Sequence, residues 1–149
     1  MKFSVGYQLR EQDEESFLSI IESYKDHIAE VYFPWLDIPS GRGSLINSAG
    51  YICWEAQNIL VNELKAIKSM GIKLDLLLNG NCYGSDGMSE NLSNKILSVL
   101  EYLKSVGCEV DVVTTASPAI AFMVKQHFPS LEVRASVNMR IGTVKGMEY

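Results

Sequence analysis

The chain has 149 residues, of which 47% are hydrophobic and 21% are charged, and its formal net charge is −5. This composition excludes a disordered or fibrous chain and is typical of one globular domain, which we expect to span residues 1–149. No apolar run approaches the ~20 residues of a membrane span and the N-terminus has no signal-peptide core, so we expect a cytoplasmic protein without a membrane partner.

Short apolar runs alternate with segments of helical periodicity, which is the pattern of βαβ units. We predict strands at 3–9, 30–35, 73–80, 109–116 and 132–141. We predict helices at 16–26, 55–70, 91–106 and 118–128. The helix at 91–106 has the clearest signals, because Ser89 is a favoured N-cap residue and Gly107 is a favoured terminator. The chain therefore predicts an α/β fold with a parallel sheet.

The predicted strands share a repeat in which each copy begins with a polar residue. Segments 75–79, 111–115 and 134–138 align with one another, and segments 30–34 and 4–8 align more loosely. Because side chains alternate between the two faces of a strand, the alignment places a largely polar set on one face. That set is Ser4, Gly6, Gln8, Asp75, Leu77, Asn79, Asp111, Val113, Thr115, Arg134, Ser136 and Asn138. The opposite face is nearly all apolar.

Charged residues recur at the starts of these strands, where Glu30, Asp75 and Asp111 align with Arg134. A buried charge without a partner costs several kcal/mol, so we expect Arg134 to neutralise one or more of the acids in a structural charged layer.

The different polarity of the two faces decides between two architectures. An open doubly wound sheet has helices on both faces and needs apolar residues on both, whereas a barrel has helices outside and a polar lumen. We therefore predict a partial TIM-type (β/α) barrel, with five parallel strands in sequential order and helices on the outer face. The alternative is a flavodoxin-like or response-regulator-like domain, which requires the first strand to lie between the second and third.

A complete barrel of this type needs about eight βα units, and only five strands are predicted here. We expect the open edges and lumen to be covered either by the missing C-terminal half of the barrel or by further copies of the chain, as a homo-oligomer. The sequence has no block of Lys and Arg, which argues against a dedicated nucleic-acid surface but leaves room for a local cationic pocket.

Three stretches resemble the N-terminal half of the U32 peptidase family, the collagenase-like proteases. They are residues 76–84, 111–121 and 133–139, and the last two match best. The resemblance implies a TIM-type barrel, a peptidase and hence hydrolase assignment, and, for some relatives, hydroxylation of RNA or ubiquinone supported by an iron–sulfur cluster. The family's cysteine-rich signature lies downstream of the matched half. Cys53, Cys82 and Cys108 are therefore not assigned as cluster ligands, no cofactor is evident, and we expect this chain alone to be inactive.

Barrel proteins bind ligands at the C-terminal ends of their strands. The candidate ligand-binding residues there are Gln8, Asn79, Asn81, Cys82, Thr115, Ser117, Asn138 and Arg140. Most are neutral hydrogen-bonding groups, which suit a peptide or a small polar molecule, and they assign neither a catalytic residue nor a metal site. A noncatalytic ligand-binding or assembly module is therefore the alternative to a peptidase.

Local structural roles compete with binding at several of these positions. Asn79 and Asn138 have the strongest case for binding, whereas Thr115 and Ser117 precede a predicted helix and are expected to cap it. Cys82 has no predicted histidine neighbour to activate it. The glycine-containing loop at 39–44 carries Arg42 and could hold an anion, although loops of this kind are usually mobile and we expect that here.

Overall fold

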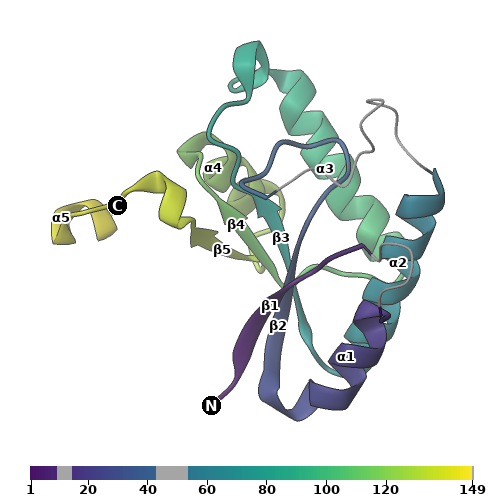
Figure 1. The fold of residues 1–149 in the computed structure, drawn as a ribbon. Helices are drawn as coiled ribbons and strands as arrows, with labels where there is room; N and C mark the ends of the chain where they lie inside the picture. The colour runs from purple at the N-terminus through teal and green to yellow at the C-terminus, as the bar shows by residue number, and fades with distance from the viewer. Residues whose placement is uncertain (10–14, 43–53, 149) are drawn as a thin grey trace.

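The computed structural model describes residues 1–9, 15–42 and 54–148, and within them one parallel sheet forms the centre of the molecule. Its strands are β1 (Phe3–Gly6), β2 (Ile28–Pro34), β3 (Lys73–Leu78), β4 (Val112–Thr115) and β5 (Glu132–Ala135), paired in that order. The α-helices are α1 (Phe17–Tyr24), α2 (Trp54–Ser69), α3 (Glu90–Ser105), α4 (Pro118–His127) and α5 (Val144–Met147). Short 3-10 turns are η1 (Lys25–His27), η2 (Gly84–Asp86) and η3 (Val137–Met139). The strand order confirms the sequential arrangement and rules out the flavodoxin-like alternative (Figure 1).

Helix ends follow the capping signals in the sequence. The hydroxyl of Ser89 accepts a hydrogen bond from Leu92 N at 3.1 Å at the start of α3. Gly107 follows that helix at a φ of +83°, a conformation that side chains other than glycine rarely adopt. Ser117 caps α4, where it accepts from Ile120 N at 3.4 Å. The predicted capping role of Ser117 is therefore confirmed.

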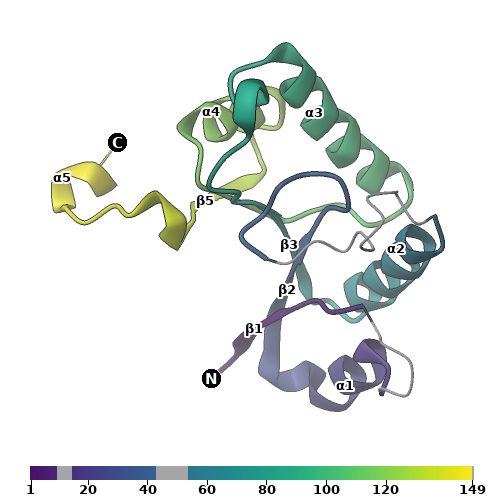
Figure 2. The same cartoon turned by 45° about the horizontal axis from the view of Figure 1, so that its top comes forward.

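Helices α1 to α4 lie along one side of the sheet and form an arc around it (Figure 2). Their apolar stripes pack on alternate residues of the strands, such as Val31, Leu76 and Val113, which are completely buried in the main core. Each large apolar side chain buried in this way contributes roughly 1.5–3 kcal/mol. The concave side of the sheet has no such helical layer among the described elements, as a partial barrel requires. No helix in the described residues is long and apolar enough to cross a membrane.

The predicted alignment of β4 was wrong by one residue. Asp75 pairs with Val112, and Leu78 pairs with Thr115. This shift turns Thr114 rather than Thr115 toward the concave face, and it moves Asp111 to the helix side. Asp111 there accepts hydrogen bonds from Lys68 Nζ at 2.6 Å and from Leu74 N at 2.9 Å.

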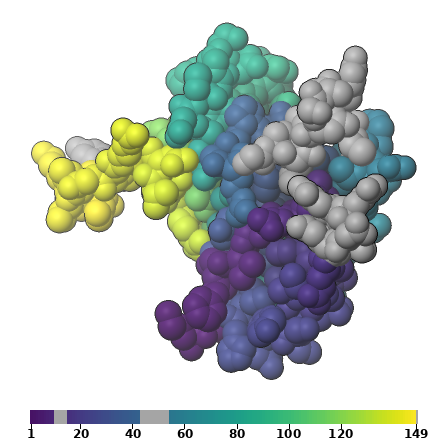
Figure 3. Space-filling view, in the orientation of Figure 1, coloured from purple at the N-terminus to yellow at the C-terminus, as the bar shows by residue number. Residues whose placement is uncertain are grey.

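The strand predicted at 132–141 ends at Ala135. The hydroxyl of Ser136 accepts a hydrogen bond from Asn138 N at 3.2 Å, and this local contact turns the chain into η3. Beyond it the C-terminal segment stands away from the body as an arm (Figures 1 and 3). Val137, Val144 and Met147 on this arm are 91%, 74% and 69% exposed.

Candidate functional site

Polar contacts cross the concave face and take one side chain from every strand. Arg134 of β5 donates from Nη1 and Nη2 to the two carboxylate oxygens of Glu30 in β2, at 2.8 and 3.2 Å. Ser4 of β1 donates to Glu30 Oε1 at 2.7 Å. Thr114 of β4 donates to Asp75 Oδ2 in β3 at 2.7 Å, and Arg134 Nη1 lies 3.5 Å from the same oxygen. We call these five residues the lumen layer.

The lumen layer confirms most of the predicted charged layer and shows how the sheet curves. Strands β2 and β5 are separated by two other strands, yet Arg134 bridges them directly. Such a contact is made across the hollow of a curved sheet. Asp111 was wrongly placed in this layer, because the shifted register of β4 takes it to the opposite face.

Burial and pairing shift the pKa values of the two acids of the layer in opposite directions. The hydrogen bond from Arg134 lowers the pKa of Glu30 below its ordinary value of 4.5. Desolvation by burial raises the pKa of Asp75 to about 6, although Thr114 and Arg134 partly oppose it. Asp75 is only 3% exposed, and its Oδ1 has no hydrogen-bond partner among the described residues. The layer is thus satisfied mainly by its own members and holds the strands together.

A loop after β2 lies over the C-terminal ends of the strands (Figure 2). Gly41 N donates to Asn79 Oδ1 at 2.8 Å, and Asn138 Nδ2 donates to the Asn79 carbonyl at 3.0 Å. Gly80 packs against Pro39, where a Cβ on Gly80 would stand 2.9 Å from the proline ring. We call this end of the sheet, with its loop and amides, the mouth.

Arg42 extends the same loop over the first two strands. Its guanidinium carbon lies 5.1 Å from the centre of the Tyr32 ring, in a cation–π contact. A Cβ on Gly6 would stand 1.6 Å from Arg42 Nη1, so only glycine leaves room for the guanidinium. These contacts pack residues 39–42 against the strands, while residues 43–44 lie outside the described part of the chain; the expected mobility of this loop stays a prediction.

The structure brings Asn79 and Asn138 together at the mouth, as the sequence predicts. Ser136 joins them, since Asn79 Nδ2 donates to its hydroxyl at 3.4 Å. The sequence repeat placed Ser136 on the correct face, but Ser136 was not among the predicted site residues. Thr115 does not join them. Its side chain is on the helix side, where its hydroxyl accepts from Ser117 N at 3.1 Å.

The other predicted site residues lie on the exposed surface. Gln8, Asn81, Cys82 and Arg140 are all exposed. The sulfur of Cys82 accepts a hydrogen bond from Gly84 N at 3.3 Å, a local turn contact. Arg140 has a φ of +51° at the end of η3. Hydrogen bonds in the described residues do not link these four side chains to Asn79.

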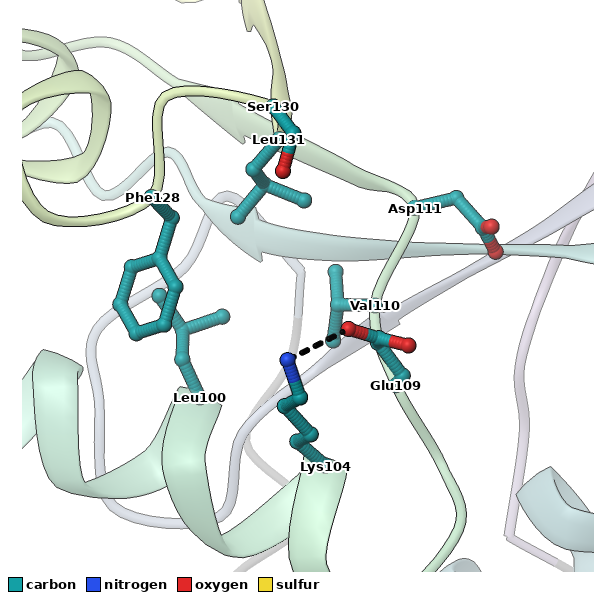
Figure 4. A pocket seen from close by; sticks show the side chains of 8 residues that line it. All are labelled: Leu100, Lys104, Glu109, Val110, Asp111, Phe128, Ser130 and Leu131. Carbon is teal, nitrogen blue, oxygen red and sulfur yellow. Dashed lines mark ion pairs between the residues drawn. The ribbon is translucent and has the colours of Figure 1, made fainter.

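A separate cavity of about 250 Å³ opens at the opposite end of the sheet (Figure 4). Leu100, Phe128 and Leu131 form its apolar part, and Lys104 pairs with Glu109 at 3.1 Å on its rim. In barrel proteins the N-terminal ends of the strands serve stability rather than ligand binding. Sequence reasoning gave no signal for this cavity, because its apolar residues are indistinguishable from core.

A larger cavity of about 860 Å³ lies between α4, β5 and the C-terminal arm. Phe122, Val133 and Met139 are among its lining residues, and Phe122 is 73% exposed. In a complete barrel the helix after a fifth strand covers this side of the strand. The cavity therefore lies on the side of β5 that a following helix would cover in a complete barrel.

The residues described for this chain contain no group of three or more His, Cys, Asp or Glu side chains arranged to hold a metal ion. The mouth instead offers side-chain amides, a hydroxyl and one guanidinium, which are groups that recognise and orient a polar ligand.

Comparisons with known proteins give a structural relative. No family model matches the sequence, and no curated protein matches it. The structure is similar to that of the U32 peptidase Mk0906, with a TM-score of 0.66 over 98% of this chain and 16% sequence identity. The match covers 53% of the Mk0906 chain, so this chain spans about half the length of that protein. The fold of this chain is therefore similar to that of about half of a U32 peptidase, in agreement with the resemblance in its sequence.

Proposed function

We propose that this chain is one half of a U32-peptidase-like barrel and that its mouth binds a peptide. The observation that carries the proposal is that nearly the whole chain superimposes on one part of a U32 peptidase, while its own polar side chains gather where barrel proteins bind their ligands.

Counting only contacts among the described residues, the two asparagines at the mouth have hydrogen-bonding capacity left for a peptide backbone. Each side-chain amide nitrogen carries two hydrogens. Asn79 Nδ2 uses one for Ser136, and Asn138 Nδ2 uses one for the Asn79 carbonyl. The remaining N–H groups and the Asn138 carboxamide oxygen match the C=O and N–H groups of an extended peptide.

We propose that hydrolysis depends on groups outside this chain. Amides and a guanidinium can orient a scissile bond and stabilise negative charge on its oxygen, but cleavage also needs an activated nucleophile or water. Those groups would come from the remaining part of the barrel, whether that part is further polypeptide or another copy. A noncatalytic binding module would bind a peptide in the same way, but it would not cleave the peptide even with the remaining part of the barrel present.

Fluorescence anisotropy with a fluorescein-labelled peptide of mixed sequence tests the binding. The chain should bind it saturably, and mass spectrometry should find no cleavage by the chain alone. Asn79→Ala should weaken binding roughly five-fold, because a hydrogen bond in such a site contributes on the order of 1 kcal/mol. Ser130→Ala, at the opposite cavity, should bind as the wild type does. The absence of saturable binding, or equal binding by Asn79→Ala, would refute the proposal.

A further inference from the structure

We infer that Arg42 makes the mouth a receptor for the carboxylate of a peptide, so that its ligand is a peptide with a free C-terminus. This inference rests on the proposed peptide binding and adds the class of peptide.

Residues of two neighbouring strands determine the position of the Arg42 guanidinium. Tyr32 of β2 lies under one of its faces, and Gly6 of β1 leaves the space that its Nη1 occupies. Tyr32 and Gly6 are paired residues on the concave face. A guanidinium is a planar fork of N–H donors, and a fork whose position is fixed by its neighbours can bind a carboxylate through two hydrogen bonds.

The two acids of the lumen layer are engaged by a different cation. Arg134 contacts both Glu30 and Asp75, and Asp75 is the register partner of Tyr32. Within residues 1–9, 15–42 and 54–148 no ion pair joins Arg42 to a carboxylate. The mouth thus carries the Arg42 guanidinium beside a lumen layer in which Arg134 contacts both acids.

The loop carries Arg42 directly after the residue that contacts the amides. Gly41 precedes Arg42, and a Cβ on Gly41 would stand 2.8 Å from Asn138 Nδ2 and 3.3 Å from Asn79 Nδ2. In the proposed complex, the peptide places its terminal carboxylate on Arg42 and its preceding amide groups on Asn79 and Asn138.

Two peptides that differ only at the C-terminus test this inference. One ends in a free acid and the other in a primary amide, and both carry the same fluorophore at the N-terminus. The wild-type chain should bind the acid at least ten-fold more tightly than the amide, because a charge-assisted bidentate contact exceeds a neutral hydrogen bond. The preference should shrink as salt is added.

Arg42→Gln should abolish the preference, because it should weaken the binding of the acid peptide much more than that of the amide peptide. Lys104→Gln removes an exposed cation at the opposite end and should keep the preference. Gly6→Ala gives a second, independent variant, since its methyl group displaces the guanidinium and should also remove the preference. Circular dichroism checks that each variant is folded.

The outcomes separate this inference from the proposed function. Equal wild-type affinity for the acid and the amide would overturn the role of Arg42 and leave peptide binding intact, whereas failure of both peptides to bind would overturn both. Inorganic phosphate serves as the competing anion. If it binds at the mouth more tightly than the acid peptide, the site is a phosphate site and the inference is wrong.

Discussion

Replacing Arg134 by methionine tests whether the lumen layer holds the curved sheet together. Arg134→Met keeps much of the apolar stem but leaves Glu30, whose side chain is 10% exposed, without its cation. Removing one partner of a fully buried ion pair costs about 3–5 kcal/mol, and an exposed pair contributes roughly 0–1 kcal/mol. Because the Arg134 side chain is 40% exposed, we expect an intermediate loss of about 2 kcal/mol.

The loss should depend on pH in a direction that the pKa of Glu30 fixes. Its pKa is lowered in the folded state, so the stabilisation is present above the ordinary value of 4.5 and disappears as the pH falls and the carboxylate is protonated. The difference between the wild type and Arg134→Met should therefore be largest near pH 7 and shrink below pH 4.5.

Urea unfolding measures this difference. With a slope of roughly 2 kcal/mol per M for a domain of this size, the midpoint should fall by about 1 M at pH 7. Lys104→Met is the matched control, because its pair with Glu109 is 64% and 62% exposed and should contribute no more than about 0.5 kcal/mol. If Arg134→Met cost no more than Lys104→Met, the contact across the lumen would not stabilise the fold.

Three further substitutions test the lumen layer and a helix start. Asp75 has its pKa raised from 3.8 to about 6, so its favourable contribution is complete below pH 3.8 and is lost as the pH rises through 6. The unfolding free energy of Asp75→Asn, relative to that of the wild type, should therefore increase by roughly 2–3 kcal/mol between pH 4 and pH 8. Urea titrations at several pH values measure this difference, and a difference that does not change with pH would contradict the burial effect. Thr114→Val removes the donor to Asp75 and should raise the pKa of that carboxyl further, as carbon-detected NMR titration would show; an unchanged or lower pKa would argue against the hydrogen bond. Ser117→Ala should cost about 1 kcal/mol by loss of the α4 cap, whereas Ser130→Ala should leave the thermal midpoint nearly unchanged.

The overall sidedness of the sheet could be read from the sequence because it follows from alternation within each strand. In β3 every second residue, such as Leu74 and Leu76, is apolar and packs under the helices. Asp75 falls between them and faces the lumen. Local alternation of this kind needs no knowledge of distant contacts, and the order of the elements then fixes the parallel topology.

The register of β4 could not be read in the same way. Its sequence Val112-Val-Thr-Thr115 has the same polarity at both parities, so either face could have been the lumen face. The prediction relied on aligning Asp111 with Asp75 by charge. Only the tertiary partners distinguish them, since Lys68 of α2 binds Asp111 and Thr114 binds Asp75.

The mouth was only half predictable. The repeat identified Asn79 and Asn138 as neighbours, although Asn138 reaches this place through the η3 turn rather than by continuing β5. The position of Arg42 depends on a cation–π contact and on the missing side chain of Gly6, which lies 36 residues earlier in the numbering and carries no local signal. Contacts of this kind become visible only once the strands are in place.

Peptide binding at the mouth is tested most directly by ¹H–¹⁵N chemical-shift perturbation, with an unlabelled peptide acid added to the labelled chain. We expect shifts confined to the mouth, at the amides of Gly41, Asn79 and Asn138. Shifts centred on Leu100 and Phe128 at the opposite cavity, or no shifts at saturating peptide, would contradict this expectation.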